Sequence, residues 1–205
     1  MPRPISATID AAALAHNLGV ARAHAPHAKA FAVIKANAYG HGLLRAAAAL
    51  RGADGFAVIE FDAAVRLRDA GYTQRIVLLE GFFDTREAAE GAARRLSAVV
   101  HTDDQLALLD AVAAGARLDV LLKVNSGMNR LGYAPGAVHG AWTKLQEHPG
   151  VRKLTLMTHF ADADGARGVA QQVATFEAAT NDLPGERSLC NSAATLRHHG
   201  LRSDW

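Results

Sequence analysis

The sequence predicts an α/β protein built on a parallel (β/α)8 barrel. Three observations carry this prediction. Seven short apolar segments recur along the 205 residues, and each ends in a polar residue. Stretches with helical spacing of apolar residues separate them, and strands that alternate with helices indicate a parallel sheet. A doubly wound sheet would also fit, but the fairly even spacing and the polar residues at the strand ends favour a barrel.

The seven apolar segments are expected to be buried strands. Each is about six residues long, is rich in Val, Ile, Leu or Phe and lacks strict alternation, as a parallel strand covered on both faces does. A further short strand is expected at residues 5–9, before the first helix. The seven segments are AFAVIK (30–35), GFAVIE (55–60), RIVLLE (75–80), LSAVVH (96–101), DVLLKV (119–124), KLTLMTHF (153–160) and RSLCNS (187–192).

Helices are expected between these strands. Asp84 and Asp103 can accept hydrogen bonds from first-turn amides, and Gly71 and Gly115 follow expected helix ends. Because a closed barrel of this class needs eight strands and only seven are visible, we expect one domain, 1–205, that is incomplete. The expected helices include 61–70, 87–94, 103–114 and 137–147.

Composition restricts the class of protein. Half of the residues are hydrophobic and 20% are charged, which is typical of a globular domain. Cys190 is the single cysteine, so an internal disulfide is excluded and a reducing, cytoplasmic location is expected. No segment reaches about 18 apolar residues, and Asp10 and His16 interrupt any signal-like core, so neither a membrane span nor a secretory signal is expected. The net charge of +2 is not clustered, so we do not expect nucleic-acid binding.

Lys35 is the first candidate for chemistry, because it ends the most apolar of the predicted strands. A lysine at a strand end usually extends into solvent. At the active edge of a barrel, however, a desolvated lysine amine can attack a carbonyl group and form a Schiff base. Tyr39, Gly40 and Gly42 follow before a helix, where backbone N–H groups can approach an anion.

The segment AVIKANAYGHG, residues 32–42, resembles the pyridoxal-phosphate lysine motif of alanine racemases. The resemblance covers the whole chain in collinear order, and the residues of the matching segments are most similar to the catabolic, DadX-type enzymes of proteobacteria. The other strings that carry it are LLEGFF at 78–83, LLKVNSGMNRLGY at 121–133, LMTHFADAD at 156–164 and CNSAATL at 190–196.

The resemblance implies roles for particular residues. Lys35 would bind pyridoxal 5'-phosphate covalently and move the α-proton on the D-alanine side. Tyr39 would hydrogen-bond the cofactor phosphate, and His159 would pack against the pyridine ring. The segment containing Asn191 and Ser192 would contact the phosphate. The implied substrates are L-alanine and D-alanine.

Lys123 and Arg130 form a second implied pair. They are two positively charged side chains seven residues apart in the sequence. If both face the same site they repel each other, unless a negative charge lies nearby. In alanine racemases the matching lysine is often carbamylated by CO₂, which turns it into an anion that pairs with the arginine. The resemblance therefore implies N6-carboxylysine at Lys123, with Arg130 contacting the cofactor hydroxyl and the substrate. Asn125 replaces an aspartate of other members, as in DadX-type sequences.

The sequence also departs from the family. After the position of Trp205, members continue with an Arg-Pro-Gly segment, a last barrel strand and a β-rich C-terminal domain whose tyrosine acts across a homodimer interface. We therefore expect that the 205-residue chain alone does not racemise alanine, and that Tyr133, near the active face, is the first alternative second base. Two other hypotheses stay open: a non-catalytic pyridoxal-phosphate-binding barrel of the homeostasis type, and a non-functional fragment.

Two further groups of residues are set aside. His159, Asp162 and Asp164 have a spacing that could bind a metal, but no further histidine or cysteine completes the set, so no metal site is expected. Cys190 is expected to be a small buried residue, because no nearby base indicates a nucleophile.

Overall fold

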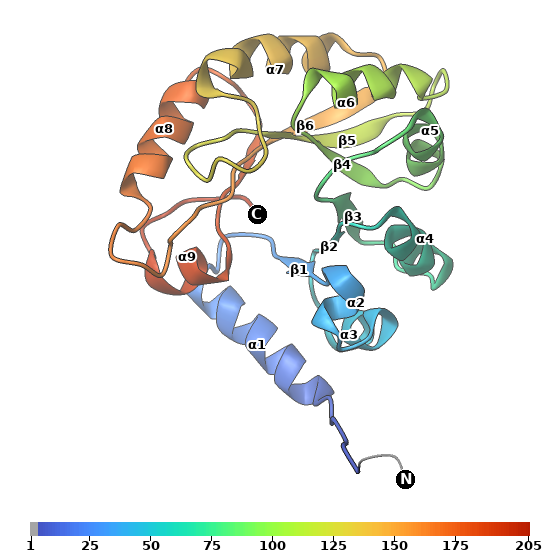
Figure 1. The fold of residues 1–205 in the computed structure, drawn as a ribbon, viewed down its shortest axis with the longest axis vertical. Coiled ribbons are helices and arrows are strands. Elements are labelled where there is room, and N and C mark those ends of the chain that lie inside the picture. Colours follow the sequence, from blue (N-terminus) through green and yellow to red (C-terminus); the bar gives the residue numbers. More distant parts are fainter. Residues whose placement is uncertain (1–3) are drawn as a thin grey trace.

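The computed structural model describes residues 4–205, and within them seven parallel strands form one sheet in chain order. The sheet curls on itself, and helices surround it on the outside (Figure 1). Each of the seven predicted segments contains a strand, so the predicted parallel barrel class is confirmed, although the last strand ends at Ser188 instead of at residue 192. Their bounds are β1 Phe31–Val33, β2 Gly55–Val58, β3 Arg75–Leu78, β4 Ser97–Val100, β5 Leu118–Lys123, β6 Val151–Met157 and β7 Glu186–Ser188.

The expected helices lie between the strands. Asp84 accepts a hydrogen bond from the Glu87 amide and begins α5, as predicted, and Gly71 follows α4 with a φ of 85°. The helices are α1 Ala11–His24, α2 Lys35–Tyr39, α3 Leu43–Ala49, α4 Phe61–Asp69, α5 Thr85–Ala93, α6 Asp103–Leu108, α7 Val138–Glu147, α8 Ala170–Thr180 and α9 Ser192–Arg197, with short 3-10 turns at Leu109–Ala111 and Pro135–Ala137.

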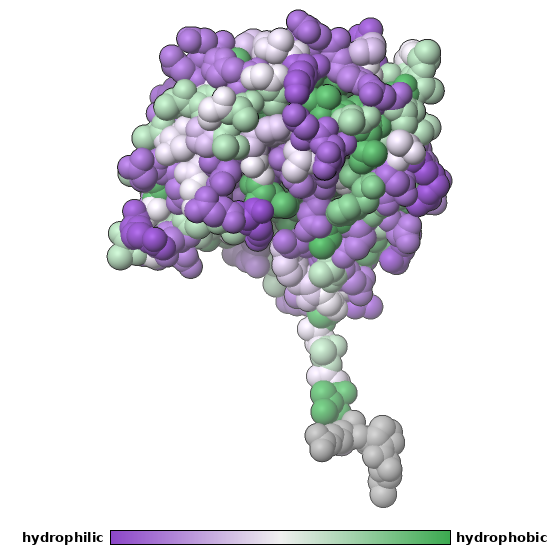
Figure 2. All heavy atoms as spheres, turned by 45° about the horizontal axis from the view of Figure 1, so that its top comes forward, coloured by the Kyte–Doolittle hydropathy of each residue, from purple (hydrophilic) through white to green (hydrophobic). Residues whose placement is uncertain are grey.

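Three local predictions are wrong. The helix expected at 103–114 ends early, because α6 stops at Leu108 and the 3-10 turn after it stops at Ala111, so Gly115 does not follow a helix end. Residues 5–9 form no strand; they lie mostly exposed in an extended segment that projects from the body (Figure 2), where no neighbouring strand can pair with their backbone. Asp103 does not cap α6. The Thr102 hydroxyl accepts the Gln105 amide instead, so Asp103 is the first helical residue.

The sheet has an inner and an outer apolar face, because successive side chains of a strand point to opposite sides. The outer side chains, such as Phe56, Ile76 and Val120, pack under the helices in the main core. The inner side chains form a separate buried cluster inside the barrel. It consists of Ala57, Val77, Val99, Leu121 and Met157, with Phe31 and Leu79 packed against it.

Within residues 4–205, β1 and β7 do not pair with each other. The last residues of the chain lie between them. The Lys29 amide donates to the Asp204 carbonyl at 2.8 Å, and the Trp205 amide donates to the Arg187 carbonyl at 3.1 Å. Residues 203–205 therefore bridge the two edge strands at the end where the strands begin.

The outer surface is mixed in character. On the face in Figure 2, hydrophobic side chains form small groups among hydrophilic ones. Across the described part of the chain, no helix combines the length and the apolar character that crossing a membrane requires.

Candidate active site

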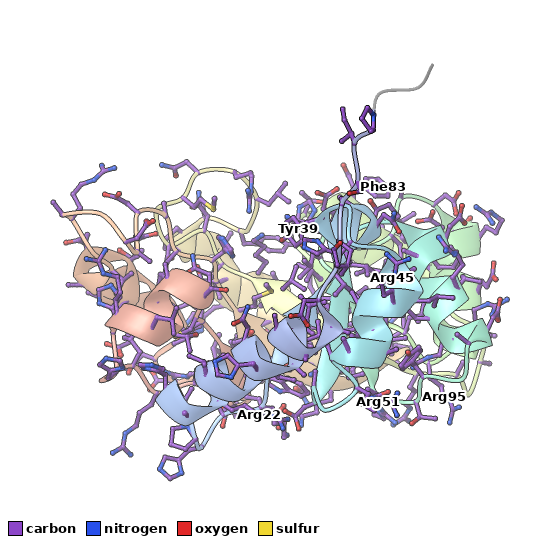
Figure 3. All side chains as sticks on the ribbon, turned by 90° about the horizontal axis from the view of Figure 1, so that it is seen from below. Arg22, Tyr39, Arg45, Arg51, Phe83 and Arg95 are labelled. Carbon is purple, nitrogen blue, oxygen red and sulfur yellow. The ribbon has the colours of Figure 1, made fainter. Side chains whose placement is uncertain are left out.

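The residues predicted from the sequence come together at one end of the barrel. Tyr39 and Phe83, which follow β1 and β3, lie at this end, whereas Arg51 and Arg95, which precede β2 and β4, lie at the opposite end (Figure 3). A hollow of about 1190 Å³ runs along the barrel interior from the first end. All the predicted site residues line it: Lys35, Tyr39, Lys123, Arg130, His159, Asn191 and Ser192. These residues therefore surround one hollow, and the role of each of them stays a prediction.

Lys35 lies two residues after the end of β1 and opens a short turn of unusual backbone conformation. Ala36, Asn37, Ala38 and Tyr39 have φ values of 49°, 53°, 55° and 53°. This left-handed conformation costs about 1–2 kcal/mol for each L-residue, and among non-glycine residues only Asn and Asp adopt it readily. Sequence reasoning did not predict this turn, and Asn37 is the only local signal for it.

Lys123 ends β5 and is only 6% exposed. Burial, reinforced by the charges of Arg130 and Lys35, lowers the pKa of Lys123 to about 8, and the negative charge of Glu80 acts in the opposite direction. The lysine amine is therefore neutral in about a tenth of the molecules at pH 7, a far larger share than for an ordinary lysine.

The loop after β5 carries Arg130 back toward the barrel. The Tyr133 amide donates to the Lys123 carbonyl at 2.8 Å, and the Asn125 side-chain oxygen accepts the amides of Gly127 and Asn129. Gly132 has a φ of 122°, and a Cβ there would lie 2.6 Å from the Asn125 nitrogen. Only glycine allows this close return of the loop.

His159 follows β6 and is partly buried. Burial, with the positive charges of Lys123 and Arg130, lowers the pKa of His159 to about 4. The imidazole is therefore neutral at physiological pH. A neutral ring at this place can pack against a flat aromatic group without adding a further cation to the site.

Asn191 and Ser192 follow β7. The Asn191 amide nitrogen donates to the Phe160 carbonyl at 3.0 Å, and its side-chain oxygen accepts the Ala194 amide at 2.9 Å, so this side chain caps α9. No hydrogen bond of the Ser192 hydroxyl is present within residues 4–205. Of the two, Ser192 has the side chain available for a ligand.

Glu80 also lines the hollow, and sequence reasoning did not single it out as a site residue. Its carbonyl oxygen accepts a hydrogen bond from the Gln105 side chain and lies 3.3 Å from Nε2 of His101. The signal that could have found it is its position as the polar residue that ends the segment RIVLLE.

Tyr133 lies at the end of the barrel where the strands end, but not in the hollow. It follows β5, and its hydroxyl donates at 3.0 Å to Asp103, which follows β4. It is buried and is not among the residues that line the hollow. Burial and the Asp103 carboxylate raise the pKa of Tyr133. A role for this tyrosine as the second base stays a prediction.

Two of the acidic residues whose spacing could suit a metal have other partners. Asp162 pairs with Arg167 at 3.0 Å, and the Arg197 side chain donates to the Asp164 carbonyl. In the region from residue 4 onward, no group of three or more His, Cys, Asp or Glu side chains could hold a metal ion. Burial raises the pKa of the Cys190 thiol.

The family model described as "Alanine racemase, N-terminal domain" matches residues 9–205. The chain belongs to this family. Proteins named alanine racemase from Burkholderia mallei are 50% identical over 205 residues, covering all of this chain and 58% of their own length. Alanine racemase from Paracidovorax citrulli is 52% identical over 209 residues, covering 57% of its length. The chain thus spans somewhat more than half of these relatives.

Solved structures give the same result for this alanine racemase N-terminal domain. The crystal structure of the biosynthetic alanine racemase from Pseudomonas aeruginosa superposes with a TM-score of 0.91 at 41% identity, covering 96% of this chain and 56% of that one. Alanine racemase from Acinetobacter baumannii gives a TM-score of 0.87 at 33% identity. The family expected from the motifs is confirmed, and the similarity does not distinguish the DadX type from others.

Proposed function

We propose that this chain binds pyridoxal 5'-phosphate through Lys35 and forms the cofactor-binding part of an enzyme that interconverts L-alanine and D-alanine. The main observation that supports this proposal is that Lys35 lines the same hollow as Tyr39, Arg130, His159 and Ser192. Membership of the alanine racemase family supports the same assignment.

The residues present suit this cofactor. Its aldehyde requires a primary amine, which Lys35 offers, and its phosphate is an anion that the Tyr39 and Ser192 hydroxyls can bind as donors. Its flat ring matches the neutral imidazole of His159, and Arg130 supplies a cation for the ring hydroxyl. These residues line one part of the hollow, whose volume of about 1190 Å³ extends along the whole barrel interior.

Pyridoxal phosphate, when bound, withdraws electrons from the α-carbon of an attached amino acid. The residues of this chain would supply the remaining functions. The Lys35 amine would take the α-proton from D-alanine and, in the reverse direction, deliver a proton to that same face, while a second group serves the opposite face. Arg130 would orient the substrate carboxylate, because a guanidinium binds carboxylates in a defined planar geometry.

We further propose that CO₂ modifies Lys123. The neutral amine attacks the carbon of CO₂, a nitrogen–carbon bond forms and one proton is released, which leaves a carbamate anion. The depressed pKa of about 8 and the 6% exposure favour this reaction, because the reactive neutral form is accessible and the anion would compensate Arg130.

Three finer assignments complete the proposal. The strings LEGFF and KVNSGMNRLG support a catabolic, DadX-type enzyme. The family resemblance supports a homodimer in which a partner supplies the second acid–base group. The single, half-buried Cys190 supports a cytoplasmic location.

The test is reductive labelling of the purified chain. The chain is mixed with pyridoxal phosphate, reduced with borohydride, digested and mapped by mass spectrometry. We expect the label at Lys35, its loss in Lys35→Ala, and its retention in Lys144→Ala, which changes a surface lysine. Exchange of the α-proton of D-alanine in D₂O then distinguishes a catalytic chain from a non-catalytic barrel that only binds the cofactor. A labelled chain that exchanges no α-proton would indicate the non-catalytic barrel, and a chain without label would indicate the non-functional fragment.

A further inference from the structure

The left-handed turn at residues 36–39 is the most unusual backbone feature near Lys35. None of its four residues is glycine, and their φ values lie between 49° and 55°. Such a run persists only where the surroundings over-determine it, and conformations of this kind cluster at ligand sites. Burial does not explain it, because Ala36, Asn37 and Tyr39 are exposed and only Ala38 is buried.

Two side chains hold the turn in place. The Asn37 side-chain oxygen accepts the Leu43 amide at 2.8 Å, which ties the turn to the start of α3. The Glu60 carboxylate accepts the Ala36 amide at 3.3 Å, which ties the turn to the start of α4, two residues after strand β2. Main-chain hydrogen bonds from Ala38 to Ile34 and from Gly42 to Asn37 complete it.

The turn lies between two residues of the proposed cofactor site. Lys35 precedes it, Tyr39 ends it, and both line the hollow. Reversing the handedness of the backbone between them would carry the Tyr39 side chain to a different side of the chain, because side-chain direction follows backbone conformation. The distance between the lysine amine and the tyrosine hydroxyl therefore depends on the handedness of this turn.

We propose that Asn37 and Glu60 are positioning residues that hold the left-handed turn, and through it keep Lys35 and Tyr39 facing the same ligand. The inference rests on the proposed function, in which Lys35 binds the aldehyde of the cofactor and Tyr39 binds its phosphate. Asn37 serves in two ways, because asparagine tolerates the left-handed region and its side chain also accepts the hydrogen bond.

The first experiment needs no cofactor. Amide hydrogen exchange of the peptide containing residues 35–43 is measured by mass spectrometry in the wild-type chain, Asn37→Ala and Glu60→Ala. We expect exchange at this peptide to accelerate about ten-fold in both variants, because each loses the acceptor of a hydrogen bond that holds the turn. Asn37→Asp and Glu60→Gln, which keep an acceptor oxygen, should exchange as the wild type does. Asn181→Ala and Glu147→Ala, changes at exposed residues elsewhere, are the matched controls.

The second experiment measures what the turn does for the ligand. Dissociation constants are measured for pyridoxal phosphate and for pyridoxal, which lacks the phosphate, in the same variants. If Tyr39 is displaced from the phosphate, the preference for pyridoxal phosphate should fall about ten-fold in Asn37→Ala and Glu60→Ala, while pyridoxal binding through Lys35 changes less. Asn37→Asp should restore the wild-type preference.

The outcomes separate this inference from the proposed function. A wild-type chain that binds neither aldehyde at Lys35 would overturn the proposed function and remove the premise of this inference. Wild-type binding at Lys35 with an unchanged preference in both variants would overturn this inference alone. Unchanged hydrogen exchange in both variants would also overturn it, because the two side chains would then not hold the turn.

Discussion

The indole of Trp205 stacks on the ring of Phe31, with the ring centroids 4.0 Å apart and the planes inclined by 12°. The Trp205 indole nitrogen also donates to Glu186 at 2.7 Å. One side chain near the end of the sequence thus contacts β1 and β7, the two strands that do not pair directly. The Arg75 guanidinium lies 5.2 Å from the Trp205 ring and adds a cation to the same cluster.

Trp205→Ala should destabilise the chain by about 2 kcal/mol, since it removes a stacked aromatic pair and a partly buried hydrogen bond. The free energy of unfolding is measured by urea titration followed by far-UV circular dichroism. Leu196→Ala, which truncates an exposed apolar residue, is the control and should change stability by less than about 0.5 kcal/mol. Equal effects of the two substitutions would mean that the Trp205 contact does not hold the strand edges together.

Glu186 should make the chain sensitive to acid. Burial alone would raise its pKa, but hydrogen bonds from Lys153, Trp205 and Lys29 overcome this and lower the pKa to about 2 from the model-compound value of 4.5. A carboxyl group whose pKa is lower in the folded than in the unfolded chain stabilises the fold at any pH above its unfolded pKa. For Glu186 this contribution is lost as the pH falls from 4.5 toward 2. Glu186→Gln should flatten the pH dependence of unfolding in that window.

The matched control for this acid sensitivity is Glu147→Gln, at an exposed glutamate of α7. Its unfolding should depend on pH as that of the wild type does. If Glu186→Gln and Glu147→Gln gave the same profile, the hydrogen bonds of Glu186 would not be the source of the acid sensitivity.

The seven strands could be predicted because parallel strands covered on both faces need continuous apolar segments, and AFAVIK and RIVLLE show this directly. The clustering of Lys35, Lys123 and His159 followed from their positions at strand ends, which meet at one end of a barrel. The left-handed turn could not be predicted, because Glu60 contacts it from the start of α4, a different part of the chain. That Tyr133 lies outside the hollow could not be predicted, because the return of its loop depends on close backbone contacts at Gly132.

Carbamylation of Lys123 should show an unusual pH dependence. At a constant concentration of dissolved ¹³CO₂, the carbamate signal of Lys123 in ¹³C NMR should appear at a lower pH than that of a lysine with the ordinary pKa of 10.5, because only the neutral amine reacts. Glu80→Gln should move this onset to a still lower pH, since it removes a negative charge that favours the protonated lysine. Lys123→Ala identifies the signal, and a carbamate that persists in that variant would contradict the assignment.

His159 should remain uncharged well below the usual histidine range. Its ¹⁵N chemical shifts should titrate with a midpoint near pH 4, because burial and the charges of Lys123 and Arg130 oppose protonation. The chain should lose stability as the pH falls from 6.5 toward 4, where the unfolded histidine binds a proton and the folded one does not. Lys123→Met should raise the midpoint by removing one positive charge, whereas an unchanged midpoint would leave burial as the sole cause.

The 205-residue chain is expected not to racemise alanine at an appreciable rate. Racemisation by two bases needs a second acid–base group on the face opposite Lys35, within hydrogen-bond reach of the α-carbon's proton. Tyr133 cannot supply it in the described structure, because its hydroxyl donates to Asp103 and lies outside the hollow, and Tyr39 is assigned to the phosphate. Losing one member of an acid–base pair typically reduces the rate by about 10²–10⁴-fold.

The assay compares conversion of L-alanine to D-alanine by this chain and by a version extended through the C-terminal domain of its relatives. Tyr133→Phe is measured beside them. That substitution should lower the free energy of unfolding by about 1 kcal/mol, since it removes one hydrogen bond to Asp103, and it should leave the labelling of Lys35 intact. Comparable turnover by the short and extended chains, abolished by Tyr133→Phe, would show that the loop after β5 reopens in solution and brings Tyr133 to the α-carbon.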